Sequence, residues 1–181
     1  MEDSPLVLAI PRRELFRLQG FTTGMDLRVL DSLAEETYFS APDLLIDSMD
    51  AKEVRLALVV VTPSLVLVTE AGVLLHTTSI PPQVAQFGKG LLGLRTLAEL
   101  AGATLLGLKK CRVELSGLLN DDTMPECRQF LTVAYVLQAL EDTAAPAGMI
   151  WVSRGALRQL PLDPVSAMAV ELAAPARSAG A

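Results

Sequence analysis

Several segments of the chain are apolar at nearly every position, as expected for strands that are buried on both faces. These runs occupy residues 6–10, 54–62, 65–69, 73–77, 111–119, 129–137 and 149–152. Most of them are followed closely by Pro, Gly, Asn or Asp, which are typical of turns. The connections between the second, third and fourth runs are too short for crossover helices. The pattern therefore predicts a sheet with a large share of antiparallel pairing.

Leucines at helical spacing separate some of these runs. The first such stripe predicts a helix from Asp26 to about Tyr38. The second covers residues 91–101, and Gly102 follows it, where a left-handed residue commonly ends a helix. Ser153 is the expected cap of a helix that continues to Leu160, and a last helix is expected over 163–172.

Polar and glycine-rich stretches predict the remaining connections. Residues 20–24 contain two glycines and should break the chain after a helical turn, and residues 40–51, with Pro42 and scattered acids, should form a loop. No repeat is visible. We therefore expect one domain over residues 1–174, an α/β fold of the α/β/α sandwich type with a mixed, largely antiparallel sheet, and a flexible tail over 175–181.

Composition narrows the class of protein. The chain has 181 residues, of which 51% are hydrophobic and 20% charged, so it can bury a core without disulfides or metals. Its net charge of −6 argues against nucleic acid or an anionic membrane as a partner. The apolar run at 56–68 is interrupted and too short to span a bilayer.

The cysteines and the N-terminal residues indicate a cytoplasmic protein. The two cysteines are not in a CxxC motif, and the chain has a single histidine, His76, so a structural zinc site is not expected. The first residues place acids before a short apolar run, whereas a secretory signal begins with basic residues.

The order of the expected elements, together with a short motif, resembles the Nudix superfamily and in particular its phosphoesterase-like branch. Nudix hydrolases carry the box G-x5-E-x7-R-E-U-x-E-E-x-G-U, where U is a bulky aliphatic residue. The segment RTLAELAGA at 95–103 falls on the second half of this box, and the matching residues are Arg95, Leu97, Glu99 and Gly102. The departures are Pro81 for the opening Gly and Phe87, Thr96 and Leu100 for three glutamates.

Three other fragments carry the resemblance outside the box. The strongest is SGLLNDDTMPE at 116–126, which is similar to a turn that precedes a histidine-led strand in this branch, although Phe130 stands at the histidine position. Weaker similarities are IPRRELF at 10–16 and DAKEVRLALVVV at 50–61. Together the fragments cover most of the chain from residue 6 to residue 172.

The resemblance implies a metal-dependent site that this chain has largely lost. In the family, several carboxylates on one helix face hold Mg²⁺ against a pyrophosphate, and here Glu99 alone remains to act with Arg95. Because Arg95 and Glu99 are four residues apart, they can equally form an ordinary ion pair along the helix. We expect no cofactor, unless relocated carboxylates still hold Mg²⁺ or Mn²⁺.

Candidate replacement ligands lie in the turn after the fifth apolar run. Asp121, Asp122 and Glu126 could bind a metal or a ligand, but Asn-Asp-Asp followed by Thr and Pro is also common turn chemistry. Lys89 and the basic cluster at 109–112 could attract a phosphorylated ligand, although charged turns are often merely solvated.

Two hypotheses of function follow, and a third concerns assembly. The first is a Nudix-fold protein that binds a nucleotide, another phosphorylated small molecule or a protein, with little or no catalysis. The second is a divalent-metal-dependent pyrophosphohydrolase of nucleoside diphosphate derivatives, in which Glu99 acts with the carboxylates of the 121–126 turn. The apolar excess further predicts a homo-oligomer, such as a homodimer.

Overall fold

The computed structural model describes residues 5–24, 27–71, 76–87, 93–105, 107–108, 110–140, 144–162 and 166. The strands are β1 (Val7–Pro11), β2 (Gly20–Thr22), β3 (Tyr38–Ser40), β4 (Ala51–Val61), β5 (Leu65–Thr69), β6 (His76–Ser79), β7 (Cys111–Asn120), β8 (Phe130–Ala139) and β9 (Met149–Ser153). The α-helices are α1 (Leu27–Glu35), α2 (Leu94–Leu105) and α3 (Arg154–Leu157). Short 3-10 helices are η1 (Arg12–Leu15), η2 (Pro42–Leu44), η3 (Pro82–Phe87) and η5 (Pro125–Cys127).

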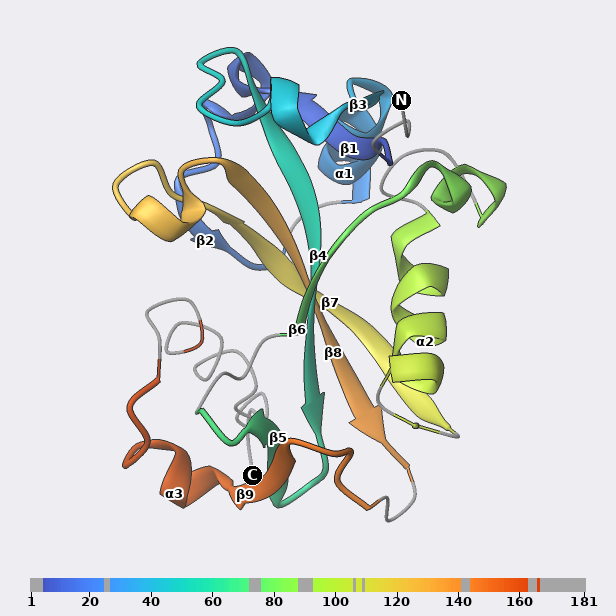
Figure 1. Cartoon of the computed structure of the whole chain (residues 1–181), viewed down its shortest axis with the longest axis vertical. Coiled ribbons are helices and arrows are strands. Elements are labelled where there is room, and N and C mark those ends of the chain that lie inside the picture. Colours follow the sequence, from blue (N-terminus) through green and yellow to red (C-terminus); the bar gives the residue numbers. More distant parts are fainter. Residues whose placement is uncertain are drawn as a thin grey trace, which may run out of the picture.

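Strand β4 is the centre of the sheet, as Figure 1 shows. Along one edge it pairs in parallel with β8 over the whole register from Glu53 to Val61. Along the other edge it meets three antiparallel strands in turn, namely β1, β6 and β5. The order of the main path is β2-β7-β8-β4-β1-β3. The sheet is therefore mixed, and β4–β8 is the one parallel pair among the described strands, as the largely antiparallel prediction requires.

Both faces of β4 are buried, which explains its almost continuous run of aliphatic residues. Leu56, Leu58 and Val60 belong to the larger core cluster, together with apolar residues of α1 and α2. The intervening Ala57, Val59 and Val61 point to the opposite face and belong to a second cluster that includes Leu157 of α3. Helical residues thus pack on both faces at the described positions, while a complete α/β/α sandwich stays a prediction.

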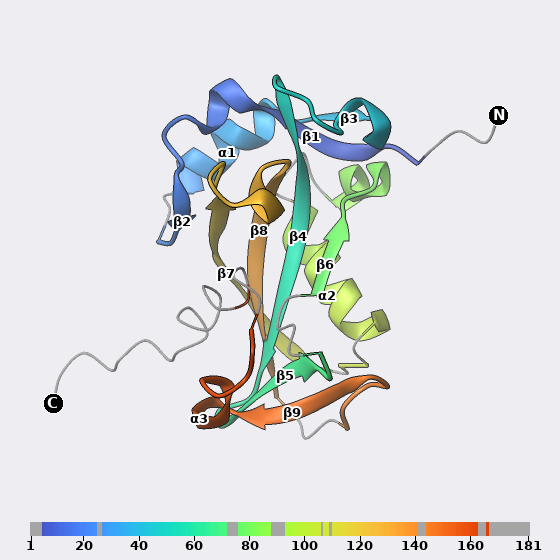
Figure 2. The ribbon, with the colours of Figure 1, turned by 60° about the vertical axis from the view of Figure 1, so that its left-hand side comes forward.

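The two ends of the sheet differ in construction. Figure 2 shows β1, β3 and α1 gathered at one end, whereas β5, β9 and α3 lie at the other. β7 and β8 form a long antiparallel hairpin between these ends, and β2 pairs with the last residues of β7. The turn that follows Asn120 therefore reaches the end that carries η1 and the start of β4.

The predicted end of the first helix was wrong. Helix α1 ends at Glu35, and Tyr38 already begins strand β3, which pairs with β1. The physical cause is Thr37, whose hydroxyl donates to the carbonyl of Ala34 at 2.8 Å and so takes up a carbonyl at the helix end. Residues 20–24, which were expected only to break the chain, also contain β2.

The predicted role of Gly102 was also wrong. Helix α2 continues to Leu105, and the glycine in the left-handed region is Gly107, with φ of +64°. Gly102 lies inside the helix against the sheet, where an added Cβ atom would stand 2.6 Å from Cδ2 of Leu137. It permits a close approach of α2 to β8 rather than a turn.

The other expected strands were confirmed within a few residues, with one difference in pairing. β5 matches the predicted 65–69, and β7 and β9 each extend the predicted run by one residue. β4 begins three residues earlier and ends one residue earlier than predicted, and β8 begins one residue later and ends two residues later. The fourth run was placed at 73–77, but the described strand is His76–Ser79, and it pairs with β4. Ser153 caps α3 as expected, since its hydroxyl accepts from the amide of Ala156, although α3 ends at Leu157 rather than Leu160.

The last expected helix and the tail fall mostly outside the described residues. Of residues 163–181, only Ser166 is described, and it is fully buried. Among the helices described, none combines the length and the apolar character needed to cross a bilayer.

Gly117 of β7 yields a test of how β2 is held against the hairpin. An added Cβ atom at Gly117 would collide with the ring of Phe21 and with the backbone oxygen of Thr22, and that oxygen cannot move without displacing β2. We expect Gly117→Ala to lower the free energy of unfolding by about 1–3 kcal/mol, as overpacking typically does. Urea denaturation followed by circular dichroism measures this loss.

Gly155→Ala is the matched control, because its added Cβ atom would meet nothing within 4 Å. Ala is a better helix former than Gly, so this variant should be neutral or slightly stabilised. Equal losses in the two variants would contradict the assignment of Gly117 as a close-approach position.

Candidate functional site

A fully buried lysine marks the end of the sheet near η1. Lys52 lies on β4 with 1% of its surface exposed, and an isolated charge in such a place would be very unfavourable. Its ammonium group donates to Oδ1 of Asn120 at 2.7 Å and to the backbone oxygen of Cys127 at 3.2 Å. It also forms an ion pair with Oδ1 of Asp122 at 2.8 Å. These three oxygens compensate for the lost hydration of the ammonium.

Asn120 joins this lysine to the N-terminal part of the chain. The residue is the last of β7 and is 3% exposed. Its amide nitrogen donates to the backbone oxygens of Leu15 and Leu18, on the side opposite to Lys52. The amide thus uses its acceptor for the lysine and its donors for the chain around η1, and this fixes its orientation.

Arg12 reaches the same carboxylate from the opposite wall. Its guanidinium donates to Oδ1 of Asp122 at 2.8 Å, to the backbone oxygen of Arg128 at 2.8 Å and to that of Ser48 at 3.1 Å. Partial burial pushes the pKa of Asp122 upward, but the hydrogen bonds and charges of Lys52 and Arg12 outweigh this effect. The pKa of Asp122 is therefore below its ordinary value, and the carboxylate stays charged near neutral pH.

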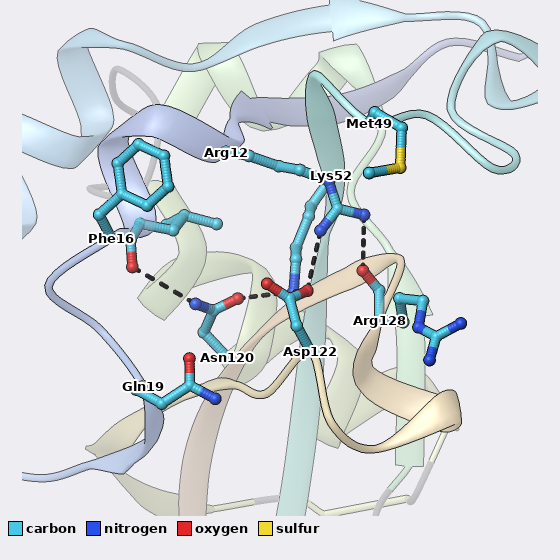
Figure 3. Close-up of a pocket in the computed structure, with 9 residues that line it drawn as sticks. Arg12, Phe16, Gln19, Met49, Lys52, Asn120, Asp122 and Arg128 are labelled. Carbon is cyan, nitrogen blue, oxygen red and sulfur yellow. Dashed lines mark hydrogen bonds and ion pairs between the residues drawn. The ribbon is translucent and has the colours of Figure 1, made fainter.

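These residues line a pocket of about 420 Å³, shown in Figure 3. We call it the Lys52 pocket, and its lining consists of Arg12, Leu15, Phe16, Gln19, Met49, Lys52, Asn120, Asp122 and Arg128. Three of these side chains are cationic and one is anionic, so the wall carries an excess of positive charge. Phe16 and Met49 stand on either side of the pocket and are largely exposed. The arrangement suits a ligand with an anionic group and an apolar part.

Asp121, the other acid of the turn, has a local structural role. Its Oδ1 accepts from the amide of Thr123 at 2.8 Å and from the hydroxyl of Thr123 at 2.6 Å. The hydroxyl and amide of Thr123 lower the pKa of Asp121. Gln19 also donates to Asp121, at 3.4 Å. The turn chemistry that the sequence suggested is thus present at Asp121, while Asp122 points to Lys52 and Arg12.

The box-like residues of α2 lie elsewhere. Arg95 Nε stands 3.4 Å from Oε1 of Glu99, with the two side chains 67% and 48% exposed. This is the i,i+4 ion pair that the spacing allows, and at such exposure it contributes little to stability.

Glu99 and the 121–126 turn lie at opposite ends of β7. Gly102, which follows Glu99 by about one turn of α2, lies against the first residue of β7, because an added Cβ atom there would stand 3.8 Å from Sγ of Cys111. Asp122 follows the last residue of the same strand, and ten strand residues span roughly 30 Å. The structure therefore does not bring Glu99 together with Asp121 or Asp122. Within the described ranges, no three His, Cys, Asp or Glu residues are grouped so that they could hold a metal ion.

Several other candidate residues lie wholly or partly outside the residues that the structure describes. Lys89 and Lys109 lie outside the described residues, as does the side chain of Glu126, although its backbone belongs to η5. Arg112 pairs with Glu114 at 2.7 Å on the exposed part of β7. His76 begins β6, and its side chain lies outside the described set.

The sequence analysis did not single out Arg12 and Lys52, which supply two of the three cations of the pocket. Arg12 lies within the fragment IPRRELF, and Lys52 lies within DAKEVRLALVVV. Asn120 and Asp122 lie within SGLLNDDTMPE. The three fragments that resemble the Nudix superfamily outside the box thus meet at one pocket. Lys52 lies before the predicted apolar run and is followed by Glu53 and Arg55, so nothing local in the sequence marked it as buried.

Comparison with known proteins supports the fold and adds no family assignment. Neither the family models nor the curated proteins include a match to this chain. Among solved structures, it is similar to the crystal structure of Tm1382, described as a candidate Nudix hydrolase. The two share 15% sequence identity with a TM-score of 0.71, and the similarity covers 92% of this chain and 97% of the other. The chain therefore has a Nudix-like fold.

The Lys52 pocket predicts different roles for two adjacent acids. Asp122→Asn removes the negative charge that faces the buried Lys52, and we expect it to lower the free energy of unfolding at pH 7 by about 1–3 kcal/mol. Asp121→Asn keeps an acceptor for Thr123 at an exposed position and should change stability much less. Thermal or urea unfolding of the two variants measures the difference. Equal effects would contradict the pairing of Asp122 with Lys52.

The same pairing predicts a dependence of stability on pH. The pKa of Asp122 is lowered in the folded state, so its contribution is complete above about pH 5 and is lost as pH falls through the folded pKa. Asp122→Asn has no such group, and its stability should therefore fall less steeply between about pH 5 and pH 2. Urea midpoints over this range provide the measurement. A wild-type slope that the variant fully retains would contradict the prediction.

Proposed function

We propose that the protein is a Nudix-fold ligand-binding protein, with little or no pyrophosphohydrolase activity, that binds a phosphorylated small molecule such as a nucleotide in the Lys52 pocket. The observation that carries the proposal is the convergence of Arg12, Lys52 and Arg128 on one pocket of about 420 Å³. Phosphate oxygens are favourable partners for such cations, and guanidinium groups can bind them through two parallel hydrogen bonds.

The cations of the pocket have different roles in this proposal. Lys52 and Arg12 already bind Asp122, so they supply the positive potential of the inner wall. Within the described part of the chain, the guanidinium of Arg128 has no ion-pair partner, whereas its backbone oxygen accepts from Arg12 and its backbone amide donates to the carbonyl of Pro125. Arg128 is therefore the group best placed to contact an incoming phosphate. Phe16 and Met49 offer apolar surface for the rest of the ligand.

The side chains of α2 that could ligate a metal support the proposed lack of hydrolysis. A divalent metal held against a pyrophosphate requires several oxygen ligands. Glu99 instead pairs with Arg95, and Thr96 and Leu100 stand where the box has carboxylates. The carboxylates of the turn that could replace them lie at the other end of β7. The described residues on α2 therefore do not fit a magnesium site.

Binding is tested by isothermal titration calorimetry with ADP and with inorganic pyrophosphate. Arg128→Ala removes one charge-assisted contact while keeping the backbone oxygen that binds Arg12, and we expect affinity for the probes to fall about tenfold or more. Arg112→Ala is the matched control, because it also removes one exposed arginine but lies near the far end of β7. Affinity should fall as salt is raised. Absence of binding to both probes, or equal losses in the two variants, would overturn the proposal.

Hydrolysis is tested separately, because the rival function is a metal-dependent pyrophosphohydrolase. Release of phosphate or nucleotide from a panel of nucleoside diphosphate derivatives is measured with Mg²⁺ or Mn²⁺, for the wild type and for Glu99→Gln. We expect no turnover that depends on Glu99. Metal-dependent turnover that disappears in Glu99→Gln would instead establish the hydrolase.

A further inference from the structure

The most exposed large apolar side chains of the described residues gather at one end of the molecule. They are Phe16 (84% exposed), Met49 (83%), Leu44 (70%) and Ile46 (63%). Phe16 follows η1, and the other three lie between β3 and β4, a part of the chain that Figure 2 places at the same end of the sheet. Exposed apolar residues are ordinary when scattered, but a group of them marks a surface that contacts something else.

The segment at 42–50, which we call the acidic loop, combines this apolar surface with negative charge. Its sequence PDLLIDSMD places Asp43, Asp47 and Asp50 among the exposed apolar residues. All three acids are exposed, and none of them forms an ion pair with another residue that the structure describes. The acidic loop therefore presents acids and large apolar groups together.

The acidic loop is held in place by its own packing. Leu45 is 5% exposed and packs in a small cluster with Val7, Ala9 and Ala51. Ser48 accepts hydrogen bonds through its backbone oxygen from Arg12 and through its hydroxyl from the amide of Ala51. A fixed loop loses little conformational entropy when it binds, which favours a role in recognition.

A cleft of about 730 Å³ on the other side of Phe16 has the complementary chemistry. We call it the arginine cleft, because Arg13, Arg17 and Arg28 line it together with Phe16 and Val29, and Glu14 is the single acid. Arg17 forms no ion pair within the described ranges. Arg13 forms ion pairs with Glu14 at 2.9 Å and with Glu36 at 3.9 Å, so the positive charge of the cleft is smaller than its three arginines alone would give, in a chain with net charge −6.

The two surfaces flank the Lys52 pocket. Met49 belongs to the acidic loop and lines that pocket, while Phe16 lines both the pocket and the arginine cleft. The face thus carries, in order, an acidic apolar surface, the pocket, and a basic apolar surface. A twofold axis through the middle of such a face would place each acidic surface on the basic surface of the other copy, as isologous dimers require.

We propose that a second copy of this chain docks on this face, with the acidic loop of each copy in the arginine cleft of the other. The acids of the acidic loop would face the arginines of the arginine cleft, and both surfaces carry exposed apolar side chains. Both surfaces belong to the same chain, so two copies can form both contacts. Because the two surfaces flank the Lys52 pocket, the dimer brings the pockets of the two copies face to face. This inference does not depend on the proposed function, since neither a ligand nor a reaction enters it.

The proposal is tested with two double variants that reverse one surface each. Arg17→Glu with Arg28→Glu makes the arginine cleft acidic, and Asp43→Lys with Asp50→Lys makes the acidic loop basic. Each variant alone opposes like charges in both contacts of the dimer, so its dimer dissociation constant should rise about tenfold or more. A mixture of the two variants restores opposite charges in both contacts, so mixed dimers should form with near wild-type affinity.

Sedimentation velocity without any ligand measures the mass, at about 50 µM, where a dimer of micromolar affinity is populated. Arg112→Glu, which reverses an exposed charge at the far end of β7, should leave the dimer intact. Circular dichroism melting confirms that each variant is folded. A dimer in the wild type, its loss in each double variant and its recovery in the mixture support the proposal.

Three results would overturn it. A monomeric wild type would show that no second copy of the chain docks on this face. Double variants that remain dimeric would place the contact elsewhere on the chain. Folded monomeric variants that do not recover the dimer when mixed would show that the acidic loop and the arginine cleft do not meet.

Discussion

The ammonium group of Lys52 lies where no water shell can surround it, so the protein must supply oxygens from parts of the chain that are distant in sequence. Asn120 comes from the end of β7, Cys127 from η5 and Asp122 from the turn between them. Each of these segments supplies an oxygen that contacts Nζ of Lys52, and this contact fixes the position of the segment. Asn120 in turn holds the chain around η1, so the start of the fold and its middle are joined through a single buried charge.

Asp122 differs from the other partners of Lys52 because it is more than half exposed. Its partial burial raises its pKa, but the hydrogen bonds and charges of the two cations beside it hold the pKa below the ordinary value. The same two cations that keep the turn in place also create the positive wall of the pocket. In the proposed function, Arg12 and Lys52 therefore combine a structural role with a ligand-binding role, and a substitution of either residue would affect both.

The sheet could be predicted from the sequence because strands that are buried on both faces are apolar at nearly every position. Aliphatic runs such as 65–69 correspond closely to strands, and Ser153 is a cap with a purely local mechanism. The error at Gly102 arose because the residue that it contacts lies far along the chain. Gly102 was interpreted as a helix end because its neighbours in sequence fit that role, whereas its neighbour in space is Leu137. The candidate site shows the same limit, since Arg12 and Asp122 are 110 residues apart, and nothing local to either indicates that they meet.

The separation of Lys52 from its acceptors also has a consequence for the growing chain on the ribosome. Asn120 and Cys127 follow Lys52 by 68 and 75 residues. While the first hundred or so residues emerge, the amino-terminal end of β4 has no oxygens with which to bury its charge, and its parallel neighbour β8 does not yet exist. The native burial of this end of β4 therefore requires the segment at 120–127, which supplies the oxygens around the ammonium of Lys52.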